Sequence, residues 1–194
     1  MKKIHNQFLI LFLIFTTTIS CKAQTIPLNT YIENIPLNAY LKDLNNELVP
    51  YIGTYQTTMD DKQITLYITK EDHKYFDLDD IKFYKDVLIV RYTVKNSSGV
   101  ILQNTQNMNF NTMLEKDLIY SRRTRPDIST ILFSYKGTNC GVGHGTIYLK
   151  KINDTQISWR YYAETTETYN GKCPSTADTT IYLPEGENLI FNKL

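Results

Sequence analysis

From Tyr51 onward, apolar and polar residues alternate with a period of two, the pattern of strands that face a core on one side. The alternation is clearest at Ile64, Leu66 and Ile68. A second run, Leu88–Val94, is apolar on both faces, which predicts that both faces are covered. The pattern predicts strands over residues 63–69, 87–94, 128–135, 146–151, 156–163, 179–183 and 188–191.

Short polar segments rich in turn-forming residues separate these runs. They include Asp60–Lys62, Asn96–Gly99 and Lys151–Thr155. Short turns between alternating runs indicate antiparallel pairing of consecutive strands, and a long meander hides its edges completely by closing into a barrel. We therefore predict a mainly β protein, an up-and-down meander that closes into a barrel, with a two-sheet β-sandwich as the alternative.

Helical spacing appears once, just before the strands. Leu41, Leu44 and Leu48 recur at intervals of three and four, Asn38 precedes them and Pro50 follows them. Asparagine is a favoured N-cap and proline a helix stop, so the segment predicts a short helix with one apolar stripe.

The N-terminus has the layout of a secretory signal peptide. Lys2 and Lys3 precede the apolar run Phe8–Phe15, which fades through threonines toward Ser20 and Cys21. A membrane-spanning helix needs about 20 apolar residues, so this run is too short to span a bilayer. We assign residues 1–20 to the signal peptide and residues 21–37 to an extended leader that contains a short echo, IPLNTY and IPLNAY. Residues 38–194 then form a single domain.

The end of this segment, Thr18–Cys21, resembles the lipobox of bacterial lipoproteins, and Ser20–Gln24 is similar to the signal ends of Bacteroidota lipoproteins. The resemblance implies that Cys21 is lipidated and anchors the chain to a membrane of the cell envelope. No acidic run follows Cys21, which favours a periplasm-facing location. The alternative is cleavage after Ala23, which would release a secreted soluble protein.

The chain has three cysteines, and lipidation or removal of Cys21 leaves an even pair. Cys140 and Cys173 would then meet in an oxidising compartment, where disulfides persist. We predict a disulfide between them.

Composition limits the classes of partner. The 194 residues are 42% hydrophobic and 12% aromatic and carry a formal net charge of +1. Nucleic-acid binding requires a strongly basic face, so we expect no nucleic-acid partner. The aromatic content and modest charge are typical of a folded core.

Two resemblances to known families follow from the start of the domain. Ala39–Tyr55 and Tyr84–Ile89 resemble segments of uncharacterised Bacteroidota lipoproteins that form a family of unknown function, which implies no activity. Gly53–Tyr55 is similar to the G-x-W of the first lipocalin strand, with tyrosine for tryptophan, and this resemblance implies a barrel. The single tryptophan, Trp159, belongs to a late strand.

Four local motifs invite a chemical interpretation. Gly141–Gly145, which contains His144, precedes a strand rather than the helix that a phosphate loop requires, so we interpret it as a turn. Asp77–Asp80 fails the EF-hand pattern and is read as a solvated acidic loop rather than a calcium site. Arg122, Arg123 and Arg125 form a basic cluster suited to lipid headgroups or an acidic partner, or to solvent alone. Asp178–Thr180 resembles a short Bacteroidota O-glycosylation sequon.

The sequence contains no G-x-S-x-G, no H-E-x-x-H and no other familiar catalytic motif, so we expect no enzyme, cofactor or metal. The leading hypothesis is a binding module that holds a small apolar or amphipathic ligand in the open end of the barrel. Its lining is predicted to include Tyr55, Leu66, Val90 and Trp159. The alternative is an envelope protein with a filled core that contacts other proteins.

Overall fold

The structure is a computed structural model that describes residues 24–78, 80–165 and 173–194. The predicted signal peptide, residues 1–20, and the predicted lipidation site Cys21 lie outside the described residues. Within these ranges the chain forms eleven β-strands and four short 3₁₀ helices. The strands are β1 (Thr25–Pro27), β2 (Tyr40–Lys42), β3 (Gly53–Met59), β4 (Lys62–Leu78), β5 (Ile81–Lys95), β6 (Ile101–Asn104), β7 (Ile119–Arg125), β8 (Thr130–Tyr135), β9 (Gly145–Lys151), β10 (Gln156–Tyr161) and β11 (Gly186–Lys193). The 3₁₀ helices are η1 (Ile32–Asn34), η2 (Val49–Tyr51), η3 (Pro126–Ile128) and η4 (Asn139–Gly141).

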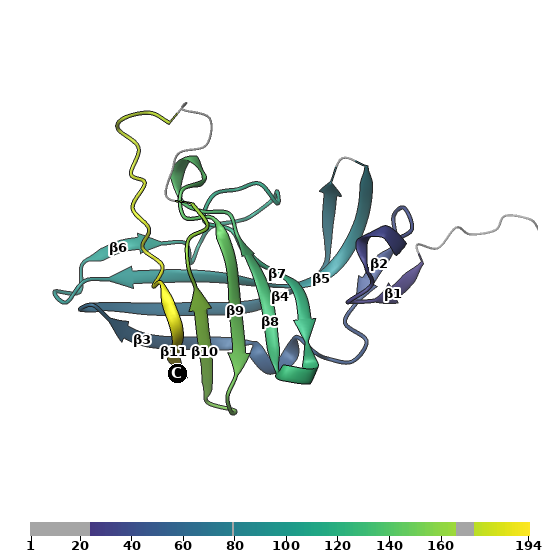
Figure 1. Cartoon of the computed structure of the whole chain (residues 1–194), viewed down its shortest axis with the longest axis horizontal. Coiled ribbons are helices and arrows are strands. Elements are labelled where there is room, and N and C mark those ends of the chain that lie inside the picture. Colours follow the sequence, from purple (N-terminus) through teal and green to yellow (C-terminus); the bar gives the residue numbers. More distant parts are fainter. Residues whose placement is uncertain (1–23, 79, 166–172) are drawn as a thin grey trace, which may run out of the picture.

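Eight strands close into an antiparallel barrel (Figure 1). Neighbours follow the order β5-β4-β3-β11-β10-β9-β8-β7, and β7 pairs back onto β5 at Ile89↔Tyr120 and Val90↔Ile119. Strands that follow one another in the chain are mostly neighbours in the barrel, which is the expected up-and-down order. The barrel prediction is therefore confirmed, and the sandwich alternative is wrong.

Large side chains fill the barrel interior. The inward positions predicted by the alternation, such as Ile64, Leu66 and Ile68, are at most 1% exposed. The largest interior side chains, each less than 2% exposed, are Trp159, Tyr55, Tyr92, Tyr135, Tyr161, Phe133 and Phe191. The Trp159 indole N–H donates to the carbonyl of Pro184 (2.9 Å), which satisfies its polar atom inside the core.

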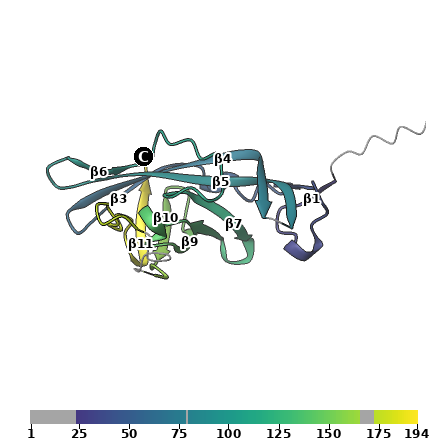
Figure 2. The same cartoon turned by 90° about the horizontal axis from the view of Figure 1, so that it is seen from above.

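The hairpin of β4 and β5 is much longer than the barrel, and its far end forms a projecting arm (Figures 1 and 2). We call this end, residues 72–86 together with β1 and β2, the arm. A β-bulge between Glu71 and Lys74, with His73 at φ 57°, bends β4 where the hairpin leaves the barrel. At the arm β2 pairs in parallel with β5, through Tyr40↔Tyr84, and β1 pairs in parallel with β2.

A second, smaller core lies on the outer face of β5. Phe83, Val87 and Ile89 point away from the barrel interior and are at most 4% exposed. Residues of the N-terminal segment and of the loop before β7 cover them, namely Ile26, Ala39, Leu41, Phe110, Met113 and Leu118. The two-sided apolar pattern of β5 therefore reflects burial on both faces, as expected. The leader likewise does more than lie on the surface, because Leu28 is buried in the barrel core.

The prediction of a helix after Asn38 is wrong. Asn38 adopts a left-handed conformation (φ 59°), and the following residues extend as β2. The Asp43 carboxylate accepts hydrogen bonds from the backbone N–H groups of Glu47 (2.8 Å) and Leu48 (3.1 Å), which holds a turn in place of a helix. Leu41 and Leu48 are buried as the pattern suggested, whereas Leu44 is 56% exposed.

The predicted strand over residues 179–183 is also wrong. Asp178 accepts a hydrogen bond from the backbone N–H of Thr180 (3.0 Å), which sets a turn at the start of the segment. The segment forms no strand. The nearby strand β10 offers it no free edge, since β10 pairs with β9 on one side and β11 on the other. The alternation instead places Leu183, 3% exposed, against the barrel core.

Candidate functional site: a cleft between the arm and the barrel

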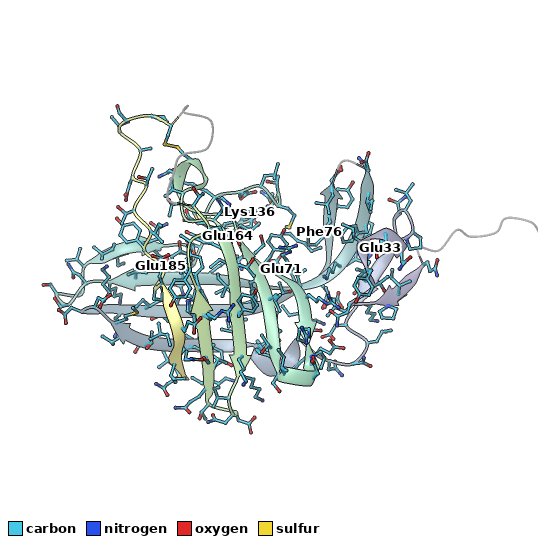
Figure 3. The ribbon with its side chains drawn as sticks, in the orientation of Figure 1. Glu33, Glu71, Phe76, Lys136, Glu164 and Glu185 are labelled. Atoms are coloured by element: carbon cyan, nitrogen blue, oxygen red, sulfur yellow. A yellow bond between two sulfur atoms is a disulfide. The ribbon has the colours of Figure 1, made fainter. Side chains whose placement is uncertain are left out.

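The candidate site forms where β5 and β7 separate. The two strands pair at Ile89 and Val90, and one further bond joins the Leu88 N–H to the Ser121 hydroxyl (2.9 Å). Beyond that point β5 continues into the arm while β7 continues along the barrel wall. A cleft of about 470 Å³ lies between them, within the range of small-molecule sites. Figure 3 shows Phe76 on the arm and Lys136 on the barrel side, and both line the cleft.

The cleft has an apolar side built from the arm and the N-terminal segment. Phe76 and Phe83 stack with their ring centroids 5.1 Å apart, and Phe76 also contacts the Tyr120 ring at 5.8 Å. The apolar lining residues are Leu28, Ile32, Ile35, Leu41, Phe76, Leu78 and Phe83. This side offers a ligand a surface that favours hydrocarbon over water.

The remaining side of the cleft is cationic. Its four charged lining residues are Lys85, Arg122, Arg123 and Lys136, and the described lining contains no aspartate or glutamate. None of the four belongs to an ion pair among the residues that the structure describes. The cleft thus presents unneutralised positive charge beside an apolar wall.

Lys85 is the most buried of these cations. Its residue is 9% exposed, and its ammonium donates a hydrogen bond to the main-chain carbonyl of Arg122 (2.6 Å). A β-bulge leaves Arg122 without a partner on β8, since the register passes from Ser121 to Arg123. Burial and the charge of Arg122 lower the pKa of Lys85 to about 8. The lysine remains mostly protonated at neutral pH, at an energetic cost.

Lys136 experiences the same environment more weakly. Its ammonium lies over the Tyr120 ring, 5.8 Å from the centroid. Partial burial and the charge of Arg122 lower its pKa. Lys85 on β5, Arg122 on β7 and Lys136 after β8 therefore line one cleft, and the described part of its lining holds no acidic group.

A buried carboxylate holds the base of the arm. Asp86, 1% exposed, accepts hydrogen bonds from the Tyr40 hydroxyl (2.5 Å) and from the backbone N–H groups of Asp43 (3.0 Å) and His73 (3.1 Å). The Lys70 ammonium lies 3.7 Å away. Burial alone would raise the Asp86 pKa, but these hydrogen bonds and the Lys70 charge lower it overall. Because Asp86 follows Lys85, the network also fixes the position of that lysine.

The N-terminal segment closes the rim of the cleft. The Arg123 guanidinium donates to the Tyr31 hydroxyl (3.2 Å) and lies 5.0 Å from that ring's centroid. Asn29 donates through its amide to Glu47 (2.9 Å) and to the Thr124 hydroxyl (2.5 Å). These contacts fasten residues 29–31 to β7 and the segment before β3.

The predicted basic cluster is divided by the structure. Arg122 and Arg123 line the cleft. Arg125 instead forms an ion pair with Asp127 (2.9 Å) and is not part of the lining. The cluster is therefore not one surface patch, and two of its three charges belong to the cleft.

A second cavity of about 640 Å³ shares Arg122, Ser134 and Lys136 with the cleft. Its lining includes the Cys140–Cys173 pair, His144 and Glu164. The two sulfur atoms lie 2.03 Å apart, which is the distance of a disulfide pair.

The four residues predicted to line a ligand pocket lie together in the barrel core. Tyr55, Leu66, Val90 and Trp159 are each at most 1% exposed. None of them lines the cleft or the second cavity. The structure thus brings them together as packing residues, and the cleft lies outside the barrel.

The other motifs take ordinary structural roles in the described chain. Gly141 and Gly143 have positive φ values of 74° and 78° in the turn before β9, as the turn interpretation expected. Asp77 pairs with Lys82 (2.8 Å) across the arm hairpin, and Asp79 lies outside the described residues. The part of the chain that the structure describes contains no group of three or more histidine, cysteine or acidic side chains placed to hold a metal. In the same residues, no helix is long and apolar enough to cross a membrane.

Sequence reasoning missed Lys85 and Lys136 as site residues. A usable signal existed for Lys85, because it interrupts the apolar face formed by Phe83, Val87 and Ile89. A lysine at such a position is rarely buried unless a partner pairs with it. Nothing comparable distinguishes Lys136, which follows the end of β8.

The fold and site define a lipocalin-like eight-stranded β-barrel with a cationic, apolar-walled cleft on its outside. A family model described as a family of unknown function (DUF6705) matches residues 1–194, and the chain belongs to that family. No match was found among curated proteins or among solved structures. The expected membership in a family of unknown function is thus confirmed, while lipoprotein character and a Bacteroidota origin stay predictions.

Proposed function

We propose that this protein is a non-enzymatic binding module that holds a small amphipathic molecule in the cleft between the arm and the barrel. The observation that carries the proposal is the cleft itself, about 470 Å³ in volume, with stacked Phe76 and Phe83 opposite polar and charged groups of β7 and β8. Apolar walls with a few convergent polar groups are the general form of a ligand site. The filled barrel interior supports this location over the open end of the barrel.

The composition of the cleft supports binding over catalysis. A buried lysine with a lowered pKa can act as a nucleophile, but such chemistry needs an acid–base partner. The described lining offers no Asp, Glu, His or Cys beside Lys85. We therefore assign Lys85 to recognition.

We also propose an envelope location, with Cys21 as the lipidated, membrane-anchoring residue and the domain facing the periplasm. The described chain begins at Gln24, and β1 follows at once and joins the arm. An anchor at Cys21 would place the cleft close to the membrane, where amphipathic molecules concentrate. Incorporation of labelled palmitate into the wild-type chain, and its loss in Cys21→Ala, tests the anchor independently of the cleft.

The binding function is tested with N-phenyl-1-naphthylamine, a neutral probe that fluoresces in apolar sites. We expect saturable fluorescence with the wild-type protein and a clear loss with Thr30→Trp, because Thr30 lines the cleft and not the second cavity. Lys150→Trp on β9 is the matched control, because Lys150 is exposed and lines neither cavity. Equal fluorescence from both variants would contradict the cleft as the site.

The competing function, contact with another envelope protein, predicts a different outcome. In that case the probe does not bind saturably, and organic extraction of protein purified from its own cells releases no small molecule. Both results together would favour the protein–protein alternative.

A further inference from the structure

We infer that the ligand of this cleft is an amphipathic anion, with its carboxylate or phosphate group held between Lys85, Arg122 and Lys136 and its apolar part against Phe76 and Phe83. This inference rests on the proposed binding function and names the chemical class that the cleft selects. It is carried by the arrangement of charge in the cleft and not by the volume alone.

The first observation is a buried, uncompensated cation. Lys85 is 9% exposed and makes one hydrogen bond, to the Arg122 carbonyl, whereas an ammonium has three donors. Buried charges in folded proteins are normally paired, because the loss of hydration is otherwise uncompensated. No carboxylate lines the cleft among the described residues, and a bound anion would supply the partner that the ammonium lacks there.

The second observation is the convergence of further positive charge on the same space. Arg122 on β7 and Lys136, the residue after β8, line the cleft with Lys85 on β5. The side chain of Arg122 makes no hydrogen bond or ion pair within the described structure, so its planar fork is available for a carboxylate or phosphate. A bound anion would relieve the repulsion among all three cations.

The third observation is the apolar wall that adjoins these cations. Phe83 and Lys85 lie two positions apart on one face of β5, so an anion at the ammonium has the stacked rings directly beside it. A small inorganic anion would satisfy the charge but leave the rings and Leu41 uncovered. An anionic head with an aliphatic or aromatic body satisfies both halves of the cleft.

Three ligands of equal chain length test the inference: decanoate, 1-decanol and decylammonium. Their affinities for the purified full chain are measured by calorimetry or by displacement of N-phenyl-1-naphthylamine. We expect decanoate to bind at least about tenfold more tightly than decanol, and decylammonium to bind most weakly. Decyl phosphate, tested beside decanoate, distinguishes a phosphate from a carboxylate head, and inorganic phosphate alone should bind far more weakly than either.

Charge-removing variants locate the effect. Lys85→Met and Arg122→Gln should each lower decanoate affinity by about five- to tenfold while leaving decanol affinity unchanged. Arg125→Gln is the matched control, since Arg125 is on the same strand but outside the cleft. Arg122 is exposed, so its variant remains informative even if Lys85→Met folds poorly.

The outcomes separate the inference from the function on which it rests. If decanoate, decanol and decylammonium bind equally well, the cleft binds amphipathic molecules but the inferred anion selectivity is wrong. If none of them binds and the naphthylamine probe does not bind either, the proposed function itself is wrong. Loss of decanoate affinity in Arg125→Gln equal to that in Arg122→Gln would also overturn the assignment of the anion to the cleft.

Discussion

The Lys85 ammonium donates a 2.6 Å hydrogen bond to the Arg122 carbonyl across the point where β5 and β7 separate. This contact joins the arm to the barrel wall at the bottom of the cleft. The acceptor, Arg122, is the β7 residue that the bulge leaves without a partner on β8. A buried lysine at this position lowers the stability of the unliganded protein. Binding of an anion would compensate for that cost.

Lys85→Met should stabilise the unliganded protein near neutral pH. The folded-state pKa of Lys85 is about 8, below its ordinary value of 10.5, so between these values the unfolded chain binds more protons and stability rises with pH. At pH 7 the substitution removes this penalty but also removes a hydrogen bond worth about 1 kcal/mol, leaving an expected net gain of about 1 to 2 kcal/mol. Urea unfolding at pH 7 and pH 10 measures the difference.

The gain should disappear at pH 10, where the wild-type lysine is already neutral. Lys150→Met, at an exposed position on β9, serves as the control and should change stability little at either pH. A Lys85→Met variant that is equally destabilised at both pH values would show that the lysine supports the unliganded fold, contrary to this account.

Decanoate affinity should depend on pH through Lys85. An anion binds the protonated lysine more tightly, so affinity should be steady below about pH 7 and fall as the pH passes through about 8. We expect a decrease of about three- to tenfold between pH 7 and pH 9.5, with decanol affinity unchanged. Calorimetric titrations of wild type and Lys85→Met provide the test, and a decrease that persists in the variant would assign the effect to another group.

Asp86→Asn should destabilise the protein and loosen the arm. The carboxylate accepts hydrogen bonds from the Tyr40 hydroxyl and from the backbone N–H groups of Asp43 and His73. In the asparagine variant the amide NH₂ group would face at least one of these donors, and that hydrogen bond would be lost. We expect a loss of about 2 to 4 kcal/mol at neutral pH, with weaker decanoate binding because Lys85 adjoins Asp86. Denaturant unfolding followed by circular dichroism measures the loss.

The pH dependence identifies the carboxylate as the cause. The folded-state pKa of Asp86 is lowered, so its contribution is present above the ordinary carboxyl pKa and is lost as the pH falls through the folded value. The stability difference between wild type and Asp86→Asn should therefore shrink in acid. Asp72→Asn, whose side chain is 68% exposed, is the control and should have a small effect at every pH.

The disulfide should contribute stability through the loop that it closes. Cys140 and Cys173 are separated by 33 residues, and closing a loop of that length in the unfolded chain is worth about 3 to 4 kcal/mol in the chain-entropy model. We expect the double variant Cys140→Ser/Cys173→Ser to unfold at lower urea while its far-ultraviolet circular dichroism stays that of a β protein. Mass spectrometry that found both thiols free in the non-reduced protein would contradict the pairing.

The barrel could be predicted because each strand is marked by a pattern within a short stretch of sequence. Alternation at Ile64, Leu66 and Ile68, with turn residues between runs, specifies strands and their inward faces. The same reasoning wrongly predicted a helix at Leu41 and Leu44, which have helical spacing. In the structure Leu41 instead pairs with the distant strand β5, and the Asp43 carboxylate holds the turn that follows. Local pattern cannot show which distant edge is available for pairing.

The cleft could not be predicted for a related reason. Lys85 and Arg122 are 37 positions apart in the sequence. They meet because β5 extends beyond the barrel, a β-bulge bends β4, and a second bulge leaves Arg122 unpaired on β8. The sequence marks these residues only as a lysine in an apolar face and an arginine in a basic cluster. Their convergence is a property of the register between β5, β7 and β8.

An amphipathic anion that binds in the cleft between the arm and β7 would contact the protein outside the barrel. The most direct measurement is the set of nuclear Overhauser contacts between bound decanoate and methyl-labelled protein. We expect contacts to Leu41 and Leu78, which line the cleft, and none to Leu66 or Val90 inside the barrel. Contacts to Leu66 and Val90 without contacts to Leu41 would place the ligand in the barrel and contradict the account.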